Sequence, residues 1–463
     1  MDIIALFHHF LKRFCDLIPD TISINDLVQT SKEATQSFLL ETLKAMIESI
    51  DAKFRVSPAR KQDYHIKNRI TRTLLTSAGV VTFQKTTYVH KRTRLFFSYI
   101  EDALGIDKWA KMTSELEAAL IDKAVTSSLE CASKLIPNLP LSRTTVSMKL
   151  KRLNTQHLLS LSVPETLVSP VETLYIEADE AHVSLQRSKQ QQTYFSKLVL
   201  THTGHDPSTG RSKRKKLHNK RYFTPCMESN EAFWQRVVES IYDTYDLSRV
   251  NHVFLSGDGA PWIEAGLKEF GHHPPFEIHL VLDRFHFNKT LRSLFAGDVK
   301  RIALAKEILA SGNREAFELF CRECYNTHRT SRTLSPSEFE KHLAYLVNRF
   351  DSIRQQQHPS YRVGCSMEGH ISHYPAARMT SRPKGFSLAN ATTLAQLQAF
   401  KLNGFSITAE VMDLMKNKTA PLFRKDAIDW GTIPSNLPVM NSTNHAYRKM
   451  VKHIQNHIPI FQI

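Results

Sequence analysis

The sequence contains little of what marks secreted or membrane proteins. Its six cysteines are spread over a chain of 463 residues, a distribution that does not resemble a disulfide framework. No apolar run approaches the roughly 18 residues that a membrane-spanning helix requires. The opening segment, MDIIALFHHFLKRF, lacks both the basic start and the small-residue cleavage site of a signal peptide. These absences predict a cytoplasmic protein with no membrane partner.

Flexible linkers and repeats are also missing. No Gly/Ser-rich stretch, internal repeat or low-complexity tract interrupts the chain. Hydrophobic residues make up 41% and charged residues 23% of the sequence, which suits a large core and argues against a disordered chain. The length predicts two or three domains.

Acidic residues are fewer than basic ones. The chain has 61 Lys and Arg against 45 Asp and Glu, a net charge of +16 and a pI of about 9.5. Residues 51–155 carry much of the excess, with 19 basic residues against 9 acidic ones. A basic excess of this size predicts an anionic partner, most often nucleic acid. The alternative is that the charge serves solubility alone.

The N-terminal third is expected to bind DNA. Residues 1–55 show helical periodicity, with Ser31 as the expected N-cap of a second helix. Within a basic region at 56–155, two β-branched runs on either side of Ser77 predict a β-hairpin. Residues 127–153 then have a helix-turn-helix layout, in which Ser142 caps the second helix. Its basic residues, expected to contact DNA, are Arg143, Lys149, Lys151 and Arg152. The alternative is an ordinary helical hairpin.

Residues 171–285 predict an α/β domain with a mixed sheet, because apolar strand patterns and helical patterns follow in the order β-β-β-α-β-α-β. The strands are expected at 174–185, 196–204, 221–228, 251–258 and 276–283, and the helices at 232–246 and 261–270. We expect an all-α insertion at 286–360, a second part of the α/β domain at 361–400, and a C-terminal tail at 401–463.

A basic run separates the second and third expected strands. Seven of the eleven residues from Arg211 to Arg221 are Lys or Arg. We expect the run to contact phosphates beside the active site, through Arg211, Lys213, Arg214, Lys215 and Lys216. The alternative is a solvated loop.

Three acidic residues carry the expected chemistry. Asp179 and Asp258 each end an apolar, strand-like run, and Glu368 lies far downstream in GCSMEGHISH. A buried carboxylate is costly unless it is paired or binds a metal, and hard divalent cations prefer oxygen ligands. If the three converge, they form a site for Mg²⁺ or Mn²⁺ that suits phosphoryl transfer on nucleic acid. Taken singly, each has a simpler interpretation as a cap, a turn residue or a surface glutamate.

Two further motifs contain possible metal ligands. Asp283 and His286 follow the fifth expected strand, and we expect them to support the metal site without touching the ion. Cys321 and Cys324 with His328 form a Cys-x₂-Cys-x₃-His pattern. It lacks a fourth zinc ligand nearby, so we interpret it as one face of a helix.

At these residues the chain resembles the DDE-type transposases of bacterial insertion sequences, and among them the ISLre-type family, which is related to the Mutator-like group. The resemblance covers nearly the whole chain. It depends on RTLLTSAGVVTFQK, IEADEAHV, GDGAPWI, LDRFHFNK and GCSMEGHISHYPAARMTSRPKGFS. One departure is Phe386, where relatives usually have Trp.

The resemblance implies a ribonuclease-H-like catalytic domain with a helical insertion before the last acidic residue. It also implies that Asp179, Asp258 and Glu368 are the catalytic triad and that they hold two Mg²⁺ or Mn²⁺ ions. The expected function is cleavage of double-stranded DNA at insertion-sequence ends and transfer of the strands to target DNA. We expect a homodimer or higher oligomer on DNA, associated with the bacterial nucleoid. The alternatives are a non-enzymatic repressor derived from a transposase, and a ribonuclease-H-like nuclease without strand transfer.

Overall fold

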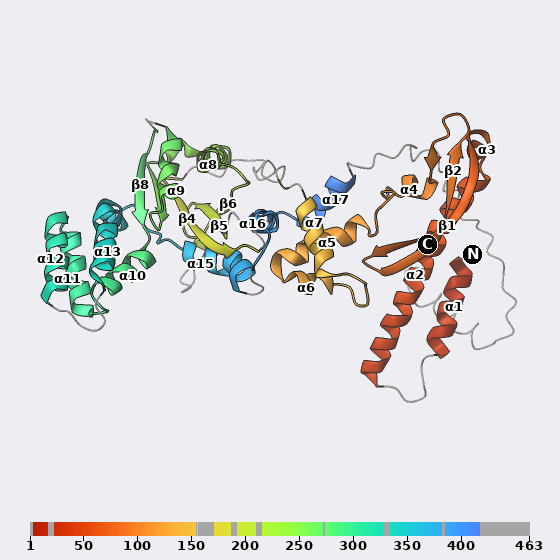
Figure 1. Cartoon of the computed structure of the whole chain (residues 1–463), viewed down its shortest axis with the longest axis horizontal. Coiled ribbons are helices and arrows are strands. Elements are labelled where there is room, and N and C mark those ends of the chain that lie inside the picture. Colours follow the sequence, from red (N-terminus) through yellow and green to blue (C-terminus); the bar gives the residue numbers. More distant parts are fainter. Residues whose placement is uncertain are drawn as a thin grey trace.

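The computed structural model describes residues 3–16, 23–153, 155, 171–186, 192–209, 215–271, 274–327, 334–381 and 385–416. The elements follow the chain from an N-terminal hairpin region, through a group of helices, to a five-stranded sheet with a helical insertion (Figure 1). Within the described residues, no helix has both the length and the apolar character that crossing a membrane requires.

The N-terminal region is a long helix packed on a β-hairpin. Its elements are α1 (Ile3–Asp16), α2 (Ile24–Val56), α3 (Pro58–Asp63), β1 (Tyr64–Thr76), β2 (Gly79–His90), β3 (Phe96–Phe97) and α4 (Tyr99–Ala103). The predicted hairpin is confirmed, and Val81 and Phe83 of β2 are buried on its apolar face against α2. The predicted cap at Ser31 is wrong. Ser23 caps α2 instead, and the Ser31 hydroxyl donates to the carbonyl oxygen of Leu27 inside the helix.

A central group of helices follows. It contains α5 (Ser114–Thr126), α6 (Leu129–Ser133) and α7 (Arg143–Arg152), and the chain returns to it with α16 (Leu388–Leu402) and α17 (Ile407–Lys416). The predicted cap of α7 is confirmed, because the Ser142 hydroxyl accepts the backbone N–H of Thr145 at 3.2 Å. Val146 and Leu150 of α7 are buried in one core with residues of α5, α16 and α17. The helix-turn-helix segment is therefore built into a larger helical core.

The α/β part contains the predicted mixed sheet. Its elements are β4 (Thr173–Ser184), β5 (Thr193–His202), η2 (Pro207–Thr209), β6 (Arg221–Phe223), α8 (Asn230–Thr244), η3 (Leu247–Arg249), β7 (His252–Gly257), α9 (Pro261–Glu264), η4 (Ala265–Phe270) and β8 (Glu277–Leu282). The strand order is β6-β5-β4-β7-β8. The strand β4 pairs antiparallel with β5 and parallel with β7, and β7 pairs parallel with β8.

Helices cover both faces of this sheet. Leu174, Ile176 and Ala178 of β4 share a core with α8 and α9. On the opposite face, Ala181 of β4 and Leu198 of β5 pack against Met367 and Ile371. Because side chains alternate along a strand, Glu177 and Asp179 belong to this second face.

The predicted helical insertion is also present. It comprises α10 (Arg284–Leu294), α11 (Val299–Ala310), α12 (Arg314–Thr327), α13 (Pro336–Asn348), α14 (Phe350–Arg354) and η5 (Gln355–Gln357), with its own apolar core. The chain then returns to the sheet with α15 (Met367–Ile371) and the π-helical segment η6 (Ser372–Ser381). The segment predicted as a tail begins inside α16, and its residues 417–463 lie outside the described structure.

Candidate active site

Asp179 and Asp258 lie at the same level of the sheet. The parallel register pairs Glu177 of β4 with Ser256 of β7, so two residues further along Asp179 is level with Asp258. The pairing of Gly257 with Leu282 places Asp283 at that level too, and the Asp283 N–H donates to the Gly257 carbonyl at 2.8 Å. Asp258 and Asp283 follow the ends of β7 and β8, but the expectation that Asp179 ends its strand was wrong, because β4 continues to Ser184 in its pairing with β5.

Glu368 approaches these residues from the far side of the insertion, close enough for its charge to act on Asp179, although among the described residues the carboxylates of Asp179, Asp258 and Glu368 do not all come within 4.8 Å of one another. It is the second residue of α15, which packs on the sheet through Met367 and Ile371. Its negative charge is one of those that raise the pKa of Asp179. The three side chains differ in solvent exposure: Asp179 is buried, Asp258 is half-buried and Glu368 is exposed. The carboxylate site is therefore open to solvent on the side of α15.

Asp179 has the most perturbed carboxyl group of the cluster. Burial raises its pKa from 3.8 to about 7, against the hydrogen bond that it accepts from the Glu180 N–H at 2.7 Å. The charges of Asp258 and Glu368 raise it further, whereas His286 lowers it. A buried carboxyl group beside two others fits the requirements of a divalent cation.

Asp283 and His286 form a hydrogen-bonded pair beside these carboxylates. Nδ1 of His286 lies 3.2 Å from Oδ2 of buried Asp283. This contact raises the pKa of His286, and the charges of Asp179 and Asp258 act in the same direction. The contact with Asp283 therefore favours the protonated form of the His286 ring beside the carboxylates.

Glu177 connects β4 to the start of α15. It is buried on the same face as Asp179, and its Oε2 accepts both the N–H and the hydroxyl of Ser366 at 2.8 Å. Its other oxygen lies 3.1 Å from Nε2 of His202. Glu177 is a residue that sequence reasoning missed, although alternation along a strand places it on the same face as Asp179. In the structure it fixes the residue two positions before Glu368.

The Asp258 loop is held by the insertion. Tyr345 of α13 donates its hydroxyl to the Asp258 carbonyl at 2.7 Å, and the Arg349 guanidinium donates to the Gly259 carbonyl. Gly259 has a φ of +78°, and a Cβ there would lie 1.9 Å from Nε of Arg349. A glycine is therefore required for the close approach of the insertion to the site.

The predicted DNA contacts on α7 differ in their surroundings. Arg143, Lys151 and Arg152 are exposed. Lys149 is half-buried and forms an ion pair with Glu117 of α5, which holds its charge against the helical core. The exposed face of α7 is thus basic, although one of its four predicted contacts already has a protein partner.

The described part of the basic run after β5 follows the end of that strand. Because β5 is antiparallel to β4, His202 at its end pairs with Tyr175, near the start of β4 and away from Asp179. Lys215 and Lys216 are exposed in the loop that follows, so for these two residues the expected place beside the active site was wrong, because it neglected the direction of the strand. Arg211, Lys213 and Arg214 lie outside the described residues.

Phe386 and the cysteine motif have structural environments. Phe386 is buried, bridges to Leu185 beyond the end of β4, and lies under the Arg378 guanidinium, 5.2 Å from the ring centre. Cys321 is buried in the insertion core and Cys324 packs against it, which confirms the predicted helix face, whereas His328 lies outside the described residues.

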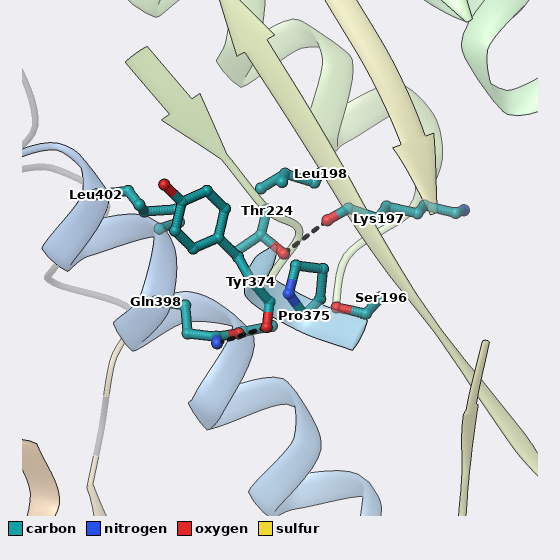
Figure 2. A pocket seen from close by; sticks show the side chains of 10 residues that line it. Ser196, Lys197, Leu198, Thr224, Tyr374, Pro375, Gln398 and Leu402 are labelled. Atoms are coloured by element: carbon teal, nitrogen blue, oxygen red, sulfur yellow. Dashed lines mark hydrogen bonds between the residues drawn. The ribbon is translucent and has the colours of Figure 1, made fainter. Parts of the chain in front are cut away.

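A small pocket contains none of the predicted catalytic residues. It is formed by β5, the segment after β6, η6 and α16 (Figure 2), and its lining residues are Ser196, Lys197, Leu198, Thr224, Tyr374, Pro375, Ala395, Gln398, Ala399 and Leu402. Thr224 donates to the Lys197 carbonyl at 2.9 Å, and this bond joins β5 to the segment after β6. Gln398 donates to the Tyr374 carbonyl at 3.0 Å and attaches the π-helical segment after Glu368 to α16, a structural role.

Sequence reasoning missed a second group of possible metal ligands, namely His252, Glu277, His279 and His358. The signal was present in the sequence, because histidines occur near the start of two neighbouring strands and Glu277 and His279 alternate onto one face. His358 could not be added to them, since it follows the insertion and joins only through the fold.

Comparison with known proteins assigns the chain to a family. Residues 17–416 match the model described as Uncharacterised protein family (UPF0236). The UPF0236 protein TTE2489 of Caldanaerobacter subterraneus subsp. tengcongensis is 27% identical over 413 residues, which cover 89% of this chain and 86% of that protein. The UPF0236 protein TTE1650/TTE2708 of the same bacterium is 27% identical over 411 residues, covering 89% and 80%. The chain therefore belongs to the UPF0236 family.

Proposed function

We propose that this protein is a DDE-type transposase that cleaves DNA at the ends of an insertion sequence and joins the strands to target DNA. One observation carries the proposal. Asp179, Asp258 and Glu368 come from β4, the end of β7 and α15, and the charges of Asp258 and Glu368 both act on Asp179 although an insertion of more than seventy residues separates the two. The fold that the proposal requires is ribonuclease-H-like, and the mixed sheet with its helical insertion is compatible with it.

The three carboxylates would hold Mg²⁺ or Mn²⁺, which activates the attacking oxygen and stabilises the charge that develops on phosphate. The protein supplies the positions of the ligands. Glu177 and Ser366 fix the start of α15, and the insertion fixes the Asp258 loop. His286, whose pKa is raised by its contact with Asp283, would support the carboxylates without touching the ion.

Two further observations support a DNA substrate and a mobile element. The net charge of +16 and the exposed basic face of α7 suit a polyanion. One relative carries a name that joins eleven designations from a single bacterium, UPF0236 protein TTE0033/TTE0744/TTE0838/TTE0852/TTE1082/TTE1247/TTE1519/TTE1678/TTE1739/TTE1823/TTE2212. Several copies within one genome are typical of an element that moves. We further propose that the protein acts as a homodimer or higher oligomer on DNA.

The test uses purified protein, Mg²⁺ or Mn²⁺, and labelled DNA that carries the ends of the element encoding it. We expect nicking at the ends and joining to a target plasmid, both abolished by EDTA. Glu368→Gln should abolish both steps while DNA binding remains. Glu239→Gln, an exposed glutamate on α8, is the matched control and should behave as wild type.

The outcomes separate the alternatives. Binding without metal-dependent cleavage would indicate a repressor, and cleavage without joining would indicate a nuclease. Normal cleavage by Glu368→Gln would refute the proposed site.

A further inference from the structure

A cluster of three histidines and one glutamate lies at the opposite end of the parallel strands from the carboxylates. His252 begins β7, Glu277 begins β8, and His279 is two residues further along β8. His358 joins them from the segment directly after η5. One donor atom from each of the four side chains lies within 4.8 Å of all the others. His252 and Asp258 are six residues apart on an extended chain, so the two clusters are about 20 Å apart.

Three of the donor atoms have the spacing of a tetrahedral metal site. Nδ1 of His252 and Nε2 of His279 are 3.1 Å apart, and Oε2 of Glu277 is 3.5 Å from each of them. Tetrahedral zinc with bonds of about 2.0–2.1 Å places neighbouring ligand atoms roughly 3.3–3.4 Å apart. The three atoms therefore form one face of a tetrahedron of nearly the correct size.

The donor types select the kind of ion. Imidazole nitrogen with one carboxylate oxygen suits Zn²⁺ and related transition metals, whereas Mg²⁺ prefers oxygen ligands alone. His252 and His279 are partly buried. The His279 ring stacks on Phe254, and the His252 ring lies tilted against the same phenylalanine, which limits the positions that both can adopt. Glu277 is largely exposed, so an ion can enter from solvent.

We propose that His252, Glu277, His279 and His358 bind one Zn²⁺ ion, which ties β7 and β8 to the segment leading back to α15. This segment, 358–366, crosses the face of the sheet that carries the carboxylates. The Tyr361 hydroxyl lies 3.1 Å from the Ser256 hydroxyl, and the Arg362 N–H donates to the Tyr175 hydroxyl at 3.3 Å. The ion would fix the beginning of the segment, and Glu177 fixes its end at Ser366.

The four ligands are not equivalent. Nδ1 of His358 accepts the Ser360 N–H at 3.1 Å. A metal bound through Nδ1 would occupy that lone pair, and a metal bound through Nε2 would require a proton on Nδ1. Binding through either nitrogen therefore replaces the hydrogen bond. His358→Ala should consequently weaken Zn²⁺ binding less than His279→Ala does.

The test uses the full chain stripped with EDTA, with Zn²⁺ affinity measured by competition against a chromophoric chelator and Co²⁺ as a spectroscopic probe. We expect one tight equivalent of Zn²⁺, an intense tetrahedral Co²⁺ spectrum and a higher melting temperature with Zn²⁺. His279→Ala should weaken Zn²⁺ binding by at least the roughly 10–100-fold that changes around a metal ligand cause. Asp179→Asn should leave Zn²⁺ binding intact, which keeps this proposal separate from the proposed function.

Two further variants keep the test decisive. Glu277→Gln changes an exposed side chain and should fold even if the histidine variants do not, so loss of Zn²⁺ affinity and of the tetrahedral spectrum in this variant would support the site. His65→Gln alters an exposed histidine on β1 and should have no effect. If Zn²⁺ binds wild type, Glu277→Gln and His358→Ala equally, the cluster is only packed histidine and the proposal fails.

Discussion

Glu177 accepts two hydrogen bonds from Ser366, one from its backbone N–H and one from its hydroxyl, both at 2.8 Å. The two residues are 189 positions apart in the chain, and the helical insertion lies between them. Asp179 is two residues beyond Glu177, and Glu368 is two residues beyond Ser366. The pair therefore sets the distance between the first and last carboxylates of the candidate site.

This relationship predicts that Ser366 acts as a positioning residue. Ser366→Ala removes one of two hydrogen bonds to a buried carboxylate, a loss of about 1.5–3 kcal/mol. We expect weaker Mn²⁺ binding and nicking slowed by roughly 10-fold or more. Isothermal titration and a nicking time course measure the two effects. Ser372→Ala, an exposed serine of η6, is the control. Unchanged Mn²⁺ affinity in Ser366→Ala would show that the start of α15 is held by other contacts.

The raised pKa of Asp179 predicts a pH-dependent stability in metal-free protein. Between the ordinary value of 3.8 and the folded value of about 7, the folded state binds more protons than the unfolded state. Stability should therefore fall as pH rises through this window, by up to about 1.4 kcal/mol per pH unit. Urea unfolding in EDTA between pH 5 and 8 measures the effect.

Asp179→Asn should flatten this dependence and raise stability at pH 8, whereas the exposed control Asp107→Asn should retain it. Mg²⁺ should stabilise the wild type more at pH 8 than at pH 6, because binding requires the ionised carboxylate. A pH profile identical in wild type and Asp179→Asn would assign the dependence to another group.

Because Arg349 packs closely against Gly259, adding a single methyl group at position 259 should disturb the candidate site. In Gly259→Ala the new Cβ must displace the Arg349 side chain, and the alanine must adopt a φ of +78°. We expect a lower melting temperature and slower nicking. Gly271→Ala is the matched control, because its φ is +81° and nothing lies within 4 Å of its Cβ position. Gly271→Ala introduces the backbone strain without the clash against Arg349. Equal losses of melting temperature and nicking rate in both variants would exclude a specific role for Arg349.

The surroundings of α7 predict that its basic residues act differently. Replacing Arg143, Lys151 and Arg152 with Ala should weaken binding to element ends. The slope of log affinity against log salt concentration should become shallower by about one for each lost phosphate contact. Lys149→Met should leave the slope unchanged and lower stability, because Lys149 pairs with Glu117. Fluorescence anisotropy over a salt series measures both. If Lys149→Met reduces this salt-dependence slope as much as the triple variant does, the Lys149–Glu117 ion pair must break when DNA binds.

The sequence by itself determined the order of the elements and the residues at the ends of the strands. Local patterns are sufficient for this, since periodicity marks a strand or a helix and Ser142 caps α7 through its own neighbours. Asp179 and Asp258 could be related in advance because each follows an apolar run that predicts a strand of the same sheet, although β4 continues beyond Asp179 to Ser184.

Only the tertiary structure decided which distant residues meet. Glu177 accepts hydrogen bonds from Ser366, Lys149 forms an ion pair with Glu117, and His358 lies beside His252 and His279. These contacts form because packing brings together segments that no local pattern relates. Lys215 and Lys216 were predicted beside Asp179 but follow the end of β5 near the start of β4, because composition carries no strand direction. Local chemistry fixes the donors and acceptors that a segment offers, whereas the packing of sheet, insertion and returning helix selects their partners.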